Sequence, residues 1–193
     1  IERELNGREA MVCDDDEPMC MGGIYGGLDS GVSTETTGVL LESAYFDPVV
    51  IRKAAKAHGL HTDASFRYER GTDPNITLYA LKRAALLIKE IAGGVISSEI
   101  KDVYPSTIEP VRIDLRYSYM DSLIGKSIER TLVKDILTSL NIQTVNENEE
   151  GLTAIVPTNK VDVTRPCDLV EEILRIYGYN NVEISDSVQS CLN

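Results

Sequence analysis

The stretch that is richest in reactive side chains runs from residue 58 to residue 74. It holds both histidines of the chain, and its other reactive residues are Thr62, Asp63, Arg67, Glu69 and Arg70. A glycine at position 59 and the pair Asp-Pro at 73–74 are typical of a helix end and a helix start, so the stretch is predicted to connect two helices. Such connections often hold binding residues, but a loop held in shape by ion pairs would have the same composition.

A second candidate is Glu42, which interrupts the apolar run Gly-Val-Leu-Leu-Glu-Ser-Ala-Tyr-Phe at residues 38–46. A run of this kind predicts a largely buried strand. A carboxylate inside such a strand is costly unless it is paired or hydrogen-bonded. Glu42 is therefore either one half of a structural ion pair or a group that recognises a ligand.

The third candidate is the glycine cluster Gly-Gly-Ile-Tyr-Gly-Gly at residues 22–27. Glycines permit positive φ and a close approach of backbone to a ligand. No Lys-Ser or Lys-Thr pair follows them, so the cluster does not indicate a phosphate-binding P-loop. A tight turn between strands and a ligand-approach loop both remain open.

Four carboxylates near the end of the chain form the last candidate site. Asp168, Glu171 and Glu172 share one face of a predicted helix, and Asp162 lies on the extended segment just before it. Oxygen ligands of this kind suit magnesium. The alternative is a solvated acidic first turn, which the helix dipole favours.

The elements that must position these residues alternate between helix and strand, which predicts an α+β fold. The predicted strands cover residues 10–13, 38–46, 95–104, 111–115, 143–148 and 152–156, and the predicted helices cover residues 48–58, 74–92, 118–125, 131–140 and 166–177. The pattern changes between Pro105 and Pro110. We therefore predict a mixed α/β domain at residues 1–106, a small winged-helix-like α+β domain at 107–185 and the start of a linker at 186–193.

Composition limits the kinds of partner. The chain has 193 residues and a formal net charge of −12, which argues against a broad nucleic-acid footprint and against DNA as a partner, so that any RNA contact must be local. No apolar run is long enough to span a membrane and no leader is apparent, so a cytoplasmic location is expected. Cys13, Cys20, Cys167 and Cys191 lack the spacing of zinc or redox sites and are expected to be reduced thiols.

Four segments together resemble the beta subunit of bacterial phenylalanyl-tRNA synthetase: residues 22–27, residues 40–46, residues 61–74 and Asp-Leu-Val-Glu-Glu-Ile-Leu-Arg-Ile-Tyr-Gly-Tyr at 168–179. They occur in the order of that family. The resemblance implies most of an editing domain followed by a small winged-helix-like domain. Because the chain opens on Ile1, a fragment is expected, and the family supplies further pocket residues, including a histidine, from upstream.

The resemblance also implies roles for the candidate residues. In that family the editing domain hydrolyses tyrosine that has been wrongly esterified to tRNA(Phe). Glu42 matches the glutamate that recognises the tyrosine hydroxyl, Thr62 and Ala64 match residues that line the pocket, and Gly23 and Gly26 match glycines that make room for the substrate. No general base is assigned, because the reaction of the family relies on a positioned water and the terminal hydroxyl of the tRNA.

For the second domain, the resemblance implies that Asp162, Asp168, Glu171 and Glu172 are magnesium ligands near the alpha subunit. The implied partners are that alpha subunit, in a heterotetramer of two alpha and two beta subunits, and tRNA(Phe). ATP would be used by the whole enzyme and not bound by this chain. The competing hypotheses are a non-catalytic scaffold for alpha-subunit assembly and tRNA contact, and an unrelated magnesium-dependent hydrolase.

Overall fold

The computed structural model describes residues 2–183, and the chain divides between Thr107 and Ile108 into two compact units. The predicted linker at residues 186–193 and Cys191 lie outside the described residues. Both units combine helices with a small sheet, which confirms the predicted α+β class. Within the part of the chain that is described, no helix has the length and apolar character needed to cross a membrane.

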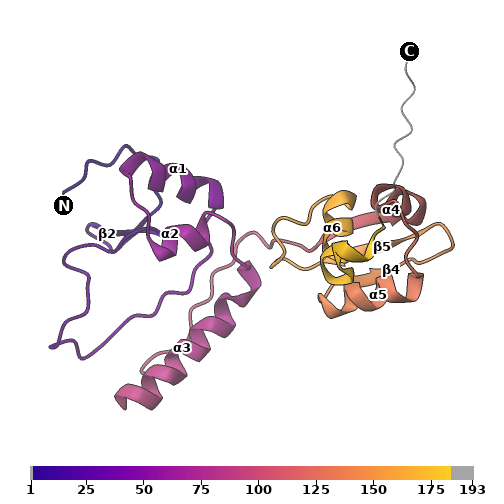
Figure 1. The fold of residues 1–193 in the computed structure, drawn as a ribbon. Helices are drawn as coiled ribbons and strands as arrows, with labels where there is room; N and C mark the ends of the chain where they lie inside the picture. Colours follow the sequence, from indigo (N-terminus) through magenta and orange to yellow (C-terminus); the bar gives the residue numbers. More distant parts are fainter. Residues whose placement is uncertain (1, 184–193) are drawn as a thin grey trace. The chain divides into compact units, whose positions relative to one another are not determined.

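The first unit begins with a two-stranded antiparallel hairpin and continues with helices (Figure 1). Its strands are β1 (Met11–Cys13) and β2 (Pro18–Met21), and its helices are α1 (Pro48–His58), α2 (Asp63–Tyr68), the 3-10 helix η1 (Pro74–Ile76) and α3 (Thr77–Ala92). Helices α1 and α2 contact each other, and they pack with the residues that follow β2. This packing encloses a small hydrophobic core.

Helix α1 forms where its capping residues predict it. The Asp47 carboxylate accepts hydrogen bonds from the backbone N–H groups of Val49 and Val50 at 2.8 and 3.0 Å, and Gly59 ends the helix with φ +61°. One face of the helix buries Ile51, which is fully inaccessible, together with Ala54 and Ala55. This face and Ile24 form the core of the unit. The core is small because only four residues are fully inside it.

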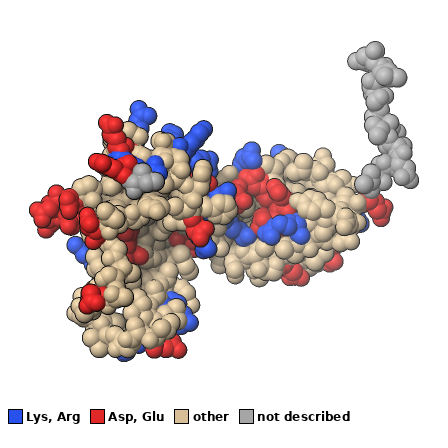
Figure 2. All heavy atoms as spheres, turned by 60° about the vertical axis from the view of Figure 1, so that its left-hand side comes forward, with Lys and Arg blue, Asp and Glu red and all other residues tan. Residues whose placement is uncertain are grey.

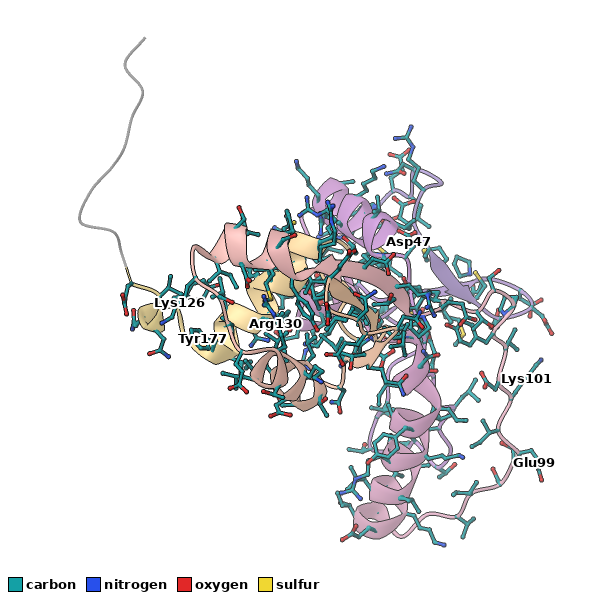
Figure 3. The ribbon with its side chains drawn as sticks, turned by 90° about the vertical axis from the view of Figure 1, so that its right-hand side faces the viewer. Asp47, Glu99, Lys101, Lys126, Arg130 and Tyr177 are labelled. Carbon is teal, nitrogen blue, oxygen red and sulfur yellow. The ribbon has the colours of Figure 1, made fainter. Side chains whose placement is uncertain are left out.

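Two predicted strands of the first unit are wrong. Residues 38–46 and 95–104 adopt no regular secondary structure, and within the described residues no strand pairs with either segment. A strand needs a neighbouring strand to satisfy its backbone hydrogen bonds, and apolar composition alone does not supply one. Figure 3 shows the second segment running as an extended loop, on which Glu99 and Lys101 project outward.

The apolar residues of these two segments lie instead against helix α3. Together with α3 they line an open cavity of about 360 Å³, to which Leu40, Leu81, Ile88 and Ile96 contribute. None of the residues of α3 is fully buried. The helix, predicted from residue 74, starts with the 3-10 turn and becomes α-helical at Thr77, with Gly93 as its C-cap.

The second unit packs helices against a three-stranded antiparallel sheet (Figure 1). Its elements are β3 (Val111–Arg116), α4 (Tyr117–Ile124), α5 (Arg130–Ser139), β4 (Gln143–Val145), β5 (Gly151–Val156), α6 (Pro166–Tyr177) and the 3-10 helix η2 (Tyr179–Asn181). The long central strand β5 pairs with β3 along its whole length and with β4 on its other edge. The predicted hairpin and the three predicted helices are thereby confirmed.

The core of this unit is larger than that of the first, since alternate residues of β3 and β5 point at the helices. Ile113 and Leu115 on β3 are buried, while Asp114 between them and Arg112 before them are exposed. Helices α5 and α6 contribute Leu137, which is inaccessible, and other apolar residues. One boundary differs slightly from the prediction of a helix at 118–125: α4 starts at Tyr117, and no side chain caps its first turn.

Candidate editing pocket and acidic helix

The predicted connection at residues 58–74 contains a short helix that was not expected, α2. Thr62 caps it: the Thr62 hydroxyl oxygen accepts a hydrogen bond from the Ser65 N–H at 3.0 Å, and the Ser65 hydroxyl oxygen accepts one from the Thr62 N–H at 3.0 Å. The Thr62 hydroxyl in turn donates to the backbone carbonyl of Ile24 at 2.7 Å. This bond joins the start of α2 to the glycine cluster, 38 residues earlier in the chain.

The glycine cluster is a turn, and its glycines serve different purposes. Gly23 has φ +67°, and a Cβ atom there would lie 2.9 Å from a ring carbon of Phe46 and 3.1 Å from one of Tyr68. Gly26 has open space around it. Gly23 is thus required by packing, whereas Gly26 leaves room beside the turn.

That room is a cavity of about 650 Å³, bordered by Gly26 and Gly27. Sulfur-containing side chains of β1 and β2 line it, together with Tyr25 and Leu60. Gly23, Glu42, Thr62 and Ala64 are absent from its lining. Of these four, Thr62 reaches the same turn through the Ile24 carbonyl, and Ala64 is exposed on α2.

Glu42 is exposed and lies in the irregular segment, which corrects the prediction of a carboxylate in a buried strand. It nevertheless lies close to the core of the first unit. Burial raises the pKa of the Tyr68 hydroxyl, and the charge of Glu42 raises it further. The pKa of the Cys20 thiol is raised in the same way, first by burial and then by Glu42. The charge of Glu42 therefore acts on Cys20 of β2 and on Tyr68 of α2.

Ion pairs support the shape of residues 58–74, as composition suggested for this stretch. Arg70 pairs with Glu69 at 2.8 Å, while Arg67 is exposed on α2. His58 pairs at 2.6 Å with Glu9, and both side chains are almost inaccessible. The hydrogen bond from His58 lowers the pKa of the Glu9 carboxyl from 4.5 to about 2. His58 is thereby engaged in holding the N-terminal segment.

In the second unit, two of the four acidic candidates are held by cations of the chain itself. Arg165 contacts both carboxylate oxygens of Asp168, at 3.2 and 2.8 Å, and lowers the pKa of that carboxyl far below its usual range. Lys160 and Arg175 contact Glu172 at 2.5 and 2.8 Å. Burial would raise the pKa of Glu172, but these two cations lower it overall.

These contacts test the fit of the chain to magnesium. Asp162 and Glu171 are exposed, and among residues 2–183 no group of three or more His, Cys, Asp or Glu side chains is placed to hold a metal ion. A carboxylate whose oxygens accept hydrogen bonds from Arg or Lys must give up those bonds before it can coordinate a cation. The donor set as arranged in this chain does not fit magnesium.

Three residues that pack beside the glycine turn or cap α2 were not predicted from the sequence. Tyr68 and Phe46 pack edge to face with ring centroids 5.1 Å apart, and Tyr68 donates a hydrogen bond to the Ala44 carbonyl at 3.3 Å. Ser65, buried on α2, completes the cap. The spacing of Thr62 and Ser65 is that of a capping pair, so this signal was present. No pattern in the sequence indicates the aromatic contact.

Comparison with known proteins identifies both units. A B3/4 domain model matches residues 1–93, and a tRNA synthetase B5 domain model matches residues 113–179. Along its whole length the chain is 55% identical, over 192 residues, to a phenylalanine–tRNA ligase beta subunit of Bacteroides fragilis. The chain belongs to the family of phenylalanine–tRNA ligase beta subunits.

Other members of the family are more distant in sequence. The beta subunit of Porphyromonas gingivalis is 46% identical over all 193 residues, and that of Thermotoga maritima is 44% identical over 182 residues, or 94% of the chain. The chain spans 23% of the length of each of these three relatives. The first unit contains the B3/4 match and the second the B5 match, so the glycine turn belongs to the B3/4 domain and helix α6 to the B5 domain.

Proposed function

We propose that the B3/4 unit of this chain contributes the editing site of a phenylalanine–tRNA ligase and hydrolyses tyrosine wrongly esterified to tRNA(Phe). The observation that supports this most directly is the hydrogen bond from Thr62 to the Ile24 carbonyl. It holds the start of α2 against a glycine turn that borders an open cavity. Glu42 lies close enough to this assembly to raise the pKa of Tyr68.

Glu42 would distinguish tyrosine from phenylalanine by accepting a hydrogen bond from the phenolic hydroxyl. Hydrogen bonds to a charged group contribute about 1.5–3 kcal/mol, which corresponds to roughly 10- to 150-fold in rate or affinity. Larger discrimination arises when the charged group is left buried and unpaired by the wrong substrate. Because Glu42 is exposed, that part of the discrimination depends on the substrate itself covering the carboxylate.

The other pocket residues would shape the site. Thr62 and Gly23 hold the turn, Gly26 leaves space for the substrate, and the Ala64 side chain is too small to obstruct an approach along α2. We assign no general base, and the attacking water would be positioned by backbone groups and by the terminal hydroxyl of the tRNA.

The test is deacylation of Tyr-tRNA(Phe) by the full-length subunit assembled with its partner. Glu42→Ala should slow the reaction by roughly 10- to 150-fold, and Glu42→Gln, which keeps the size of the side chain, should show how much of the loss is due to charge. Glu99→Ala removes an exposed carboxylate of the same unit and is the matched control. Unchanged clearance of tyrosine in Glu42→Ala would refute the role of Glu42 and favour a scaffold role for the chain.

We further propose that the B5 unit serves the assembly of the enzyme in the cytoplasm, as one part of a heterotetramer of two alpha and two beta subunits that binds tRNA(Phe) and uses ATP elsewhere. A magnesium site at Asp162, Asp168, Glu171 and Glu172 would require Arg165, Lys160 and Arg175 to release their carboxylates in that assembly. Titration of magnesium into the isolated chain should therefore leave its melting temperature unchanged.

A further inference from the structure

Helix α1 contains no acidic residue, although the chain as a whole has a net charge of −12. Its exposed side carries a group of basic side chains. Lys56 lies four residues after Arg52 and three after Lys53, so the three side chains project from the side of the helix opposite the buried residues. All three are exposed, and among the described residues neither lysine has an ion-pair partner. Figure 2 shows basic side chains near the top of the face that it draws, with acidic side chains beside them.

Beside this face, the side chain of Arg70, which follows α2, stacks on the ring of Phe66 of α2. The Arg70 guanidinium lies over the Phe66 ring at 3.6 Å from the ring centroid, and its Nη1 atom donates to the Phe66 carbonyl at 2.8 Å. The Arg70 side chain is 53% exposed and Phe66 is 58% exposed. The guanidinium is therefore held over the ring by its bond to the Phe66 carbonyl and by its ion pair with Glu69, and about half of the side chain remains exposed to solvent.

The cationic face and the stack form one surface, because Arg52 of α1 donates a hydrogen bond from Nη2 to the carbonyl of Glu69 at 2.9 Å. Glu69 directly precedes Arg70 in the chain. We name the surface made by Arg52, Lys53, Lys56, Phe66 and Arg70 the α1–α2 face. It combines charges that match phosphates with a planar group that an unpaired base can stack on.

The α1–α2 face also has a defined relation to the candidate pocket. Phe66 lies four residues after Thr62 on the same helix, which is about one turn or 5.4 Å along its axis. A strand whose terminal ester reaches the Thr62 end of α2 would therefore pass Phe66 and Arg70 a short distance upstream. The lysines of α1 would then meet its phosphates.

We propose that the α1–α2 face binds the single-stranded end of an RNA: Lys53 and Lys56 contact its phosphates, and the Arg70 guanidinium stacks on an unpaired base. This deepens the proposed function, since the RNA is the one whose ester the pocket would hydrolyse. An acidic protein would match the lysines equally well, but it would make no use of the half-exposed stack of Arg70 on Phe66, on which an unpaired base can stack. The stack therefore favours RNA over a protein partner.

The experiment measures binding of a labelled, unacylated tRNA(Phe) transcript to the full-length subunit complex at several salt concentrations. The double variant Lys53→Gln with Lys56→Gln should lower the magnitude of the slope of log affinity against log salt by about 1.4, because each phosphate contact on a single strand contributes about 0.7. The control is Lys82→Gln with Arg83→Gln, which removes two exposed cations from α3 of the same unit and should leave the slope as it is.

A second arm tests the stacked base. Arg70→Lys keeps the charge but loses the planar group, so it should weaken binding of the intact transcript by about fivefold or more. It should not affect a transcript from which the single-stranded 3′ end has been trimmed. An unchanged salt slope in the lysine variant, or an equal loss for both transcripts in Arg70→Lys, overturns the proposal.

Failure of the proposed function would look different. No ester is hydrolysed in this assay, so Glu42→Ala should bind the transcript like the unmodified protein. If the lysine variant of α1 still binds the transcript normally but no longer assembles with the partner subunit, the face serves a protein contact and the proposal is overturned.

Discussion

Replacing Thr62 by valine should destabilise the first unit, because one hydroxyl serves two elements. Its oxygen accepts from the Ser65 N–H at 3.0 Å, and its proton is donated to the Ile24 carbonyl at 2.7 Å. Loss of a helix N-cap costs about 1 kcal/mol. A buried carbonyl left without a partner costs about 1–3 kcal/mol, and Ile24 is only 2% exposed. Together, Thr62→Val should lower the free energy of unfolding of this unit by about 2–4 kcal/mol.

The measurement must separate the two units, and the chain has no tryptophan to report on either one. Native-state hydrogen exchange of peptides from residues 60–70 and 166–177 reports on each unit separately. Protection should fall in the first peptide and stay constant in the second. Thr62→Ser keeps the hydroxyl and is the matched control. Equal protection in the valine and serine variants would refute the role given to this hydroxyl.

Three further outcomes follow from single contacts. Gly23→Ala should destabilise the first unit by about 1–3 kcal/mol, because of its positive φ and the nearby Phe46 ring, whereas Gly26→Ala should change stability by less than about 0.5 kcal/mol; urea unfolding of the two variants tests this pair. Ile173→Ala on α6 should cost about 2–5 kcal/mol and Ile176→Ala on the same helix about 0.5 kcal/mol or less, since the first is inaccessible and the second is 47% exposed; equal melting temperatures would contradict it. Because the pKa of Glu9 is lowered from 4.5 to about 2, its pairing with His58 stabilises the fold fully above about pH 4.5, and this stabilisation is lost as the pH falls through about 2. In acid unfolding, the difference in stability between the unmodified protein and Glu9→Gln should therefore vanish as the pH falls from about 4.5 to about 2.

Helix boundaries were the most predictable part of the fold. Asp47 with Pro48 and the glycines at 59, 93, 125 and 178 act within one helical turn, so their effect is visible in sequence. The hairpin of the second unit was predictable for the same reason, since its partners are close in the chain. The two strands predicted at 38–46 and 95–104 failed because strand formation depends on a partner that sequence pattern does not locate.

For the candidate sites too, features that depend on local sequence were predictable and contacts between distant residues were not. The types of residue and their order were enough to predict the family, and comparison of the whole chain confirms it. The pairing of acids with bases was not predictable, because Lys160 reaches Glu172 across 12 residues and its choice of partner depends on how the loop before α6 folds. In the tertiary structure two of the four predicted metal ligands, Asp168 and Glu172, are ion-paired and the other two, Asp162 and Glu171, are exposed, and their role as ligands stays a prediction.

The sequence by itself determined the local elements, the acidic character and the family of this protein, because these depend on residue types and short spacings. Only the tertiary structure decided that Thr62 holds the glycine turn, that Glu42 is exposed beside Tyr68, and that cations of α1 adjoin the stack on α2. The physical reason is distance in the chain. Contacts between segments tens of residues apart form only when packing of the core brings them together, and a sequence pattern does not record which of the possible partners will meet.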